Sequence, residues 1–229
     1  MAAPRRLAFW LAGLCGALTL VAGCNVFSTM LYVFGPEQSN PPVLKKLASD
    51  DNKEVKVVIW AYTSTLENRP EFLRIDRELT AALYTNLHKG LEHNEEKVCL
   101  ASPQQVERFK SETPNWKRLS LDEIGKHFQA DYVICLEIES VSLYEMGSSN
   151  QLYRGRIEVN TRLVDVNEPE EVGTEKSFTC IYPSESKGPI PAGDSGPQQF
   201  KQAFLSHAGQ LLSWYFTAHP VTDEMHMID

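Results

Sequence analysis

Asp131 and Asp165 are the strongest candidates for catalytic chemistry in this sequence. Each lies beside a predicted strand, and two carboxylates with a histidine could support hydrolysis by general acid–base catalysis. Aspartate also commonly stabilises turns, and Asp131 follows Ala130 where a strand is expected to begin. We therefore interpret Asp131 as a turn residue. A hydrolase without a recognisable motif is retained as an alternative.

Established signatures of catalytic and phosphate-binding sites are missing from the sequence. It contains no GxSxG, GxxxxGK[ST], GxGxxG or HExxH pattern. His219 and His226, with Asp223 and Glu224 between them, could bind a metal weakly, but their terminal position favours a solvated tail. The glycine-rich stretch 188–196 is interpreted as a flexible loop. We predict no enzymatic activity, no cofactor and no metal site.

Cys24 is the residue with the clearest predicted chemistry. Arg5 and Arg6 precede the apolar stretch 7–20, whose length is typical of a signal peptide. The run Val21-Ala22-Gly23-Cys24 then resembles the bacterial lipobox, in which the cysteine thiol accepts a diacylglycerol before cleavage. Acyl chains such as palmitate anchor a protein stably, at about 0.8 kcal/mol per buried methylene. The sequence predicts a signal peptide over 1–23 and lipidation of Cys24.

An uncleaved membrane anchor is the alternative topology. No charged residue occurs from Leu7 to Phe34, which is long enough to cross a bilayer as a helix. Arg5 and Arg6 would then stay inside. Both topologies place the chain beyond residue 35 outside the cytoplasm. We therefore expect a membrane-anchored protein of the cell envelope that faces the periplasm.

Net charge argues against nucleic-acid partners. The chain from Cys24 onward carries 20 basic and 30 acidic side chains, a formal charge of −10, which repels phosphate backbones. Three further cysteines, Cys99, Cys135 and Cys180, fall in predicted strands, where free thiols are usually buried. A Cys99–Cys180 disulfide remains an alternative. With no CxxC pair, zinc ribbons and thioredoxin motifs are excluded.

Hydrophobic periodicity predicts one α/β (α+β) domain over residues 53–218. A proline-rich and polar tether precedes it at 24–52, and a flexible tail follows at 219–229. Alternation or continuous apolar runs predict five strands, and three- to four-residue spacing predicts helices. The strands are expected at 55–62, 97–101, 131–143, 152–166 and 172–182, and the helices after Pro70, Ser102 and Ser120 and at 198–217. This order gives one mixed sheet of about five strands with helices packed on a face.

Residues 121–143 carry a resemblance to a known group of proteins. The run LDEIGKHFQADYVICLEIESVSL resembles a segment of envelope proteins related to the penicillin-binding-protein activator LpoB, the curli secretion lipoprotein CsgG and the TolB N-terminal domain. The strand 55–62 and the run Leu163-Val164-Asp165-Val166 agree with it. The resemblance spans roughly residues 53–217 and implies a domain that docks on another envelope protein.

Departures from that group limit the expected function. The predicted hairpin turn is short, and Arg156, Glu158 and Arg162 share one strand face that lipid would not tolerate, so a pore is not expected. We predict a non-enzymatic protein-interaction or assembly module. A structural component that self-associates as a homo-oligomer is the alternative.

Overall fold

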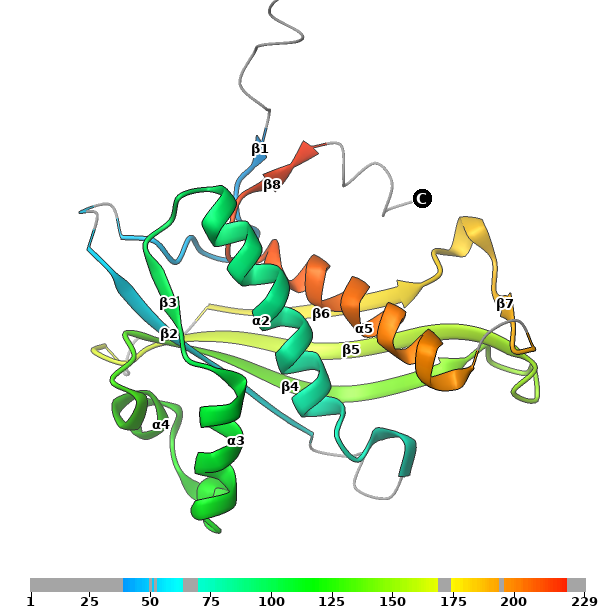
Figure 1. Ribbon diagram of the computed structural model, residues 1–229, viewed down its shortest axis with the longest axis horizontal. Helices are drawn as coiled ribbons and strands as arrows, with labels where there is room; N and C mark the ends of the chain where they lie inside the picture. The colour runs from blue at the N-terminus through cyan, green and yellow to red at the C-terminus, as the bar shows by residue number, and fades with distance from the viewer. Residues whose placement is uncertain are drawn as a thin grey trace, which may run out of the picture. The chain divides into compact units, whose positions relative to one another are not determined.

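A mixed six-stranded sheet forms the centre of the domain in the computed structural model (Figure 1). The structure describes residues 39–49, 51, 53–63, 70–168, 174–193 and 196–221, so the predicted signal peptide and Cys24 lie outside it. The strand order is β3-β2-β4-β5-β6, and β7 pairs with the start of β5. The bounds are β2 Val55–Thr63, β3 Val98–Leu100, β4 Tyr132–Tyr144, β5 Leu152–Asp165, β6 Thr174–Tyr182 and β7 Ile190–Pro191.

Strand β2 runs parallel to β3 and β4, whereas β4, β5 and β6 are antiparallel. The helices are α2 Ile75–His93, α3 Pro103–Glu112, α4 Leu121–Phe128 and α5 Pro197–Ser213, with 3-10 turns η1 Pro70–Phe72, η2 Trp116–Arg118 and η3 Glu185–Lys187. The predicted fold class is confirmed, with six strands in place of about five.

Helices α2 and α5 lie side by side over the first face of the sheet (Figure 1). Side chains of β5 alternate as predicted, and Ile157, Val159, Thr161 and Leu163 are buried beneath the helices. The largest core cluster joins Ile157, Val159 and Leu163 to residues of the two helices, namely Leu79, Leu83, Leu87, Phe204 and Leu212. Burial of this apolar stripe is the main force that holds the layers together.

Helices also cover part of the second face, which corrects the expectation of helices on one face. Strands β2 and β4 are apolar at both alternating positions, so each needs cover on both sides. Helices α3 and α4 provide it through a separate cluster that includes Val58, Trp60, Val133, Ile124 and Val166. The second face of β5 and β6 is polar instead.

The segment between α4 and β4 has the structural role expected from its sequence. A Cβ atom on Gly125 would lie 2.2 Å from Cγ2 of Val166, so only glycine permits this approach of helix and strand. Gln129 ends α4 in the left-handed conformation, with φ of 52°. The Oδ2 atom of Asp131 then accepts the backbone N–H of Lys56 at 2.8 Å. Asp131 therefore fixes the start of β4 against β2.

Residues 39–49, which are predicted to be part of the tether, pack on the domain in the structure. Strand β1, Ser39–Asn40, pairs with β8, His219–Pro220, and Val43 donates to the Trp214 carbonyl at 3.0 Å. Leu47 is only 1% exposed. Within the described ranges, no helix combines the length and apolar character needed to cross a membrane.

His219 corrects the prediction of a solvated tail that begins at this residue. The side chain is buried, and its ring stacks on that of Trp214 with centroids 4.4 Å apart. Strand β8 therefore has two partners in the fold, strand β1 and the ring of Trp214. Its position near the chain terminus does not by itself indicate these contacts. His226, Asp223 and Glu224 lie outside the described residues.

Burial of the cysteines is confirmed for Cys135 and Cys180 and is wrong for Cys99, which is exposed. Strand β3 is a three-residue edge strand, so its central residue points away from the core that Val98 and Leu100 contact. The Cys99–Cys180 disulfide is also excluded, because both thiols are free. They lie on opposite edges of the sheet, about 19 Å apart at ~4.8 Å per strand.

We expect native protein to react with iodoacetamide at Cys99 well before Cys135 or Cys180. Thiolate is the reactive species, and burial raises the pKa of Cys135 to about 11 and that of Cys180 to about 12. Peptide mass mapping over a time course at pH 7.5 measures each rate. Urea should equalise the rates, and a Cys99→Ser variant should lack the fast site. Native labelling of Cys180 as fast as Cys99 would contradict the structure.

Candidate functional site

Asp131 and Asp165 meet at one shallow surface hollow of about 420 Å³. Asp131 accepts the Lys56 amide, and Oδ1 of Asp165 accepts the backbone N–H of Asn167 at 2.9 Å. No histidine is among the residues that line the hollow in the described part of the chain. No three metal-ligating side chains gather among the described residues either. Asp131 therefore fixes β4 against β2, and Asp165 stabilises the turn that follows β5.

A larger groove of about 620 Å³ opens where β2, β4 and β5 meet η2 and α4 on the second face. We call it the aromatic groove. Its lining combines two tryptophans, a tyrosine, several aliphatic side chains and a few polar groups. These residues are Trp60, Tyr62, Thr63, Trp116, Lys117, Leu119, Ser120, Leu121, Asp122, Ile124, Cys135, Arg162 and Val164.

The two tryptophans are held in fixed positions. Trp60 is 2% exposed, and its ring meets that of Trp116 edge-on with centroids 5.4 Å apart. The Lys110 ammonium lies 4.9 Å from the Trp60 ring and 5.3 Å from the Trp116 ring, and it donates to the Ala61 carbonyl at 2.7 Å. These contacts give the groove a preformed aromatic wall.

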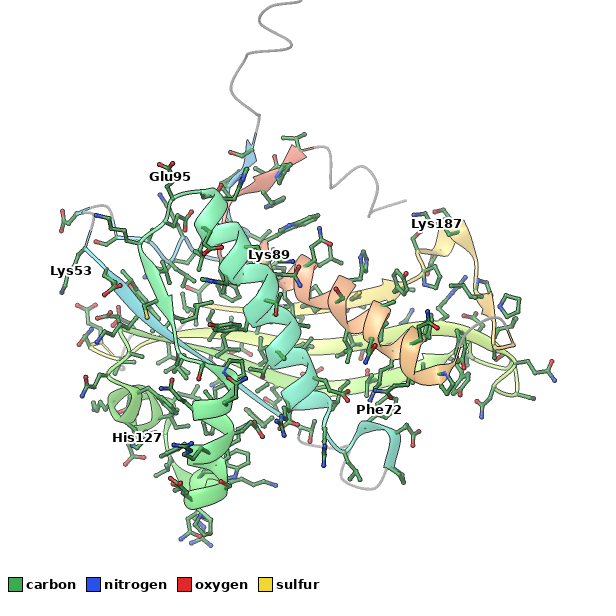
Figure 2. The ribbon with its side chains drawn as sticks, viewed as in Figure 1. Lys53, Phe72, Lys89, Glu95, His127 and Lys187 are labelled. Atoms are coloured by element: carbon green, nitrogen blue, oxygen red, sulfur yellow. The ribbon has the colours of Figure 1, made fainter. Side chains whose placement is uncertain are left out.

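Helix α4, which borders the groove, also packs against α3. The ring of His127 lies 4.2 Å from that of Phe109, between α4 and α3, as Figure 2 helps to locate. Phe109 in turn meets the Trp60 ring with centroids 5.9 Å apart. The helix predicted after Ser120 begins with a capping box, because Glu123 accepts the Ser120 backbone N–H at 2.8 Å. The rim of the groove is therefore rigidly supported.

The floor of the groove is uncharged at neutral pH. Burial raises the pKa of the Tyr62 hydroxyl, which donates to Oε2 of Glu137 at 3.0 Å. Burial also keeps the Cys135 thiol protonated. Neither group is activated as a nucleophile. Tyr62 and Cys135 can contact a bound ligand, but neither is activated to form a covalent bond with it.

Arg162 places a guanidinium with an unsatisfied N–H donor in the groove wall. Its Nε atom is buried without a hydrogen-bond partner, and the side chain makes no ion pair with any described residue. Glu175 faces Arg162 across the β5–β6 pair but accepts a hydrogen bond from the Asn160 amide. Glu137 is engaged by Tyr62. The groove therefore pairs an apolar wall with one available guanidinium.

A polar surface continues from the groove over β5 and β6. Ser140 donates to Oε2 of Glu158 at 3.0 Å, and Arg156 lies 3.9 Å from the same carboxylate. We call this surface the polar sheet face, formed by Glu137, Ser140, Arg156, Glu158, Asn160, Glu175, Ser177 and Thr179. No described helix covers it (Figure 1).

Sequence reasoning placed Arg162 on a polar strand face but missed the groove. Trp60 was expected only as part of a buried strand, and Trp116 fell in an expected loop. A large aromatic side chain in a polar loop is the signal that could have indicated a binding surface. Local spacing does not reveal that Trp60, Trp116 and Arg162 converge, because they come from β2, η2 and β5.

Comparisons with known proteins give only distant likenesses. No family model and no curated protein match the chain. Among solved structures, the PelC dodecamer from Paraburkholderia phytofirmans is 15% identical, with a TM-score of 0.37 over 77% of this chain and 97% of that one. Lipoprotein GNA1162 from Neisseria meningitidis is 12% identical, with a TM-score of 0.36 over 69% and 98% of the two chains.

The hypothetical protein CT253 from Chlamydia trachomatis is a third such structure. It is 17% identical, with a TM-score of 0.39 over 71% of this chain and 98% of that one. Lipoproteins are thus present among the solved structures that resemble this chain. A shared architecture does not define a shared role.

Proposed function

We propose that this chain is a lipid-anchored envelope protein that acts as a non-enzymatic interaction module. The observation that carries the proposal is the polar sheet face, a surface that no described helix covers and that adjoins the aromatic groove. Aromatic pockets bordered by satisfied polar groups are typical of protein-binding surfaces. Kinship with the LpoB, CsgG and TolB N-terminal group would fit this role and is part of the proposal.

The anchor is proposed from the leader, with Cys24 as the acylated first residue of the mature chain. Intact mass measured on protein purified from membranes tests it, with a Cys24→Ala variant as the comparison. We expect the native chain to begin at Cys24 and carry acyl mass, and the variant to lose both. A full-length chain without acyl groups would reject the lipid anchor and favour the uncleaved span.

Site-specific photo-crosslinking in intact envelopes tests the interaction role. A photoreactive side chain at Glu158, on the polar sheet face, should give a discrete crosslinked band. The same group at Gln202, exposed on α5 over the first face, is the matched control and should not. A product of twice the chain mass would identify self-association as the interaction. No product at Glu158 above the Gln202 level would contradict the proposal.

A further inference from the structure

We propose that the aromatic groove binds a peptide segment of a partner protein in which a carboxylate lies beside an aromatic or aliphatic side chain. This inference rests on the proposed interaction role and specifies the chemistry of the partner. It uses two features of the groove, the guanidinium of Arg162 and the aromatic wall of Trp60 and Trp116.

The unsatisfied guanidinium donor of Arg162 calls for one hydrogen-bond acceptor, and a carboxylate is the acceptor that matches it best. The surrounding carboxylates are already engaged: Glu137 by Tyr62, Glu175 by Asn160, and Asp122 by the Lys126 ammonium at 2.9 Å. Arg162 has no such partner among the described residues. A guanidinium presents donors in a planar fork that matches a carboxylate, and such charge-assisted pairs are stronger than neutral hydrogen bonds.

The remaining lining calls for an apolar side chain. Trp116, Leu119, Leu121 and Val164 are each partly exposed at the groove, so their apolar surface is in contact with water. An aromatic or aliphatic side chain would remove this surface from water, as anchor residues do in protein interfaces. The volume of about 620 Å³ lies within the range of about 300–1,000 Å³ that is usual for ligand sites.

A polyanionic ligand fits the same surface poorly. Glu137, Glu158 and Glu175 lie along the adjoining polar sheet face, and the chain has a formal net charge of −8. Several phosphates would be repelled by all of these carboxylates, whereas a single carboxylate at Arg162 would have only Glu175 directly opposite. A peptide with one acidic residue therefore matches the groove better than a nucleic acid does.

Two fluorescein-labelled peptides test the proposal with full-length protein in detergent. Both have the sequence Gly-Ser-Phe-X-Ser-Gly-amide, where X is glutamate in one and glutamine in the other. Fluorescence anisotropy should show about five- to tenfold tighter binding of the glutamate peptide at low salt, and this ratio should fall in ~1 M salt. A peptide ending in a free phenylalanine carboxylate, compared with its amide, distinguishes a chain terminus from an acidic side chain.

Substitutions test separately the contributions of the Arg162 guanidinium and of the aromatic wall. Arg162→Gln should remove the preference for the glutamate peptide and leave the weaker affinity for the glutamine peptide, whereas Trp116→Ala should weaken both. Arg162→Lys keeps the charge without the fork and should retain part of the preference. Arg77→Gln is the matched control, because Arg77 is exposed on α2 over the first sheet face and lies outside the groove lining. Circular dichroism and thermal unfolding verify that each variant is folded.

Three results would overturn the proposal. These are equal binding of both peptides by native protein, an unchanged preference in folded Arg162→Gln protein, and displacement of the peptide by inorganic phosphate at lower concentration than by acetate. The last result would identify a phosphate site. If crosslinks at Glu158 persist while the peptides fail to discriminate, the interaction role stands and the groove chemistry is rejected. If those crosslinks are absent, the proposed function itself fails.

Discussion

Replacement of Phe204 by alanine is expected to lower the free energy of unfolding by about 4 kcal/mol, the usual scale for a buried phenylalanine. Phe204 projects from α5, is 0% exposed and belongs to the core between the helices and the first sheet face. Removal of its ring leaves a cavity that a rigid sheet cannot fill. Urea unfolding followed by circular dichroism measures the change.

The contact between Gly155 and the Phe204 ring allows this packing arrangement to be tested directly. A Cβ atom at Gly155 would lie 2.5 to 2.8 Å from three carbons of the Phe204 ring. Gly155→Ala should therefore cost about 2 kcal/mol in the native background and much less in the Phe204→Ala background. Leu73→Ala is the surface control, because Leu73 is 68% exposed, and should change stability by less than about 0.5 kcal/mol. Additive effects of the two core substitutions would contradict the proposed contact.

The second large effect is expected from the ion pair between α2 and α5, in which Lys201 is buried and Glu78 is partly exposed. The Nζ atom of Lys201 lies 2.9 and 2.8 Å from the two carboxylate oxygens of Glu78 and donates to the Glu71 carbonyl at 3.3 Å. Lys201 is only 8% exposed. Glu78→Leu would leave a buried ammonium without its counter-ion, so we expect a loss of about 3 kcal/mol in the free energy of unfolding.

A double variant separates loss of the pair from loss of packing. Glu78→Leu combined with Lys201→Met removes both charges and should recover most of the stability, because apolar replacements of buried pairs are often neutral. Lys126→Ala, which breaks the exposed Asp122–Lys126 pair, should cost no more than about 0.5 kcal/mol. Glu78→Leu with a cost as small as this control would show that Lys201 is effectively solvated.

The strands, helices and the local motif at α4 could be predicted because their signals are local. Alternation in β5, the capping boxes at Ser102 and Ser120 and the need for glycine at position 125 each depend on neighbouring residues. Helices cover both faces of the sheet because β2 and β4 are apolar on both faces. This cover could be predicted only by combining that pattern with the number of helices available to provide it.

The groove and the strands at the chain ends could not be predicted in the same way. Trp60, Trp116 and Arg162 meet only because β2, η2 and β5 are brought together by the tertiary fold. Strands β1 and β8 are two residues long, too short to show a period, and each forms because the other is present. Non-local pairing of this kind leaves no mark in a single sequence.

The β1–β8 pairing also decides how a force on the anchor would enter the domain. Tension applied at Ser39 would pass through β8 and through backbone hydrogen bonds from Val43 and Leu44 to Trp214 and Tyr215, directly beyond the end of α5. The load would thus reach the central core helix rather than a peripheral loop. Strand β8 therefore lies directly beside the point at which such a load would enter the domain.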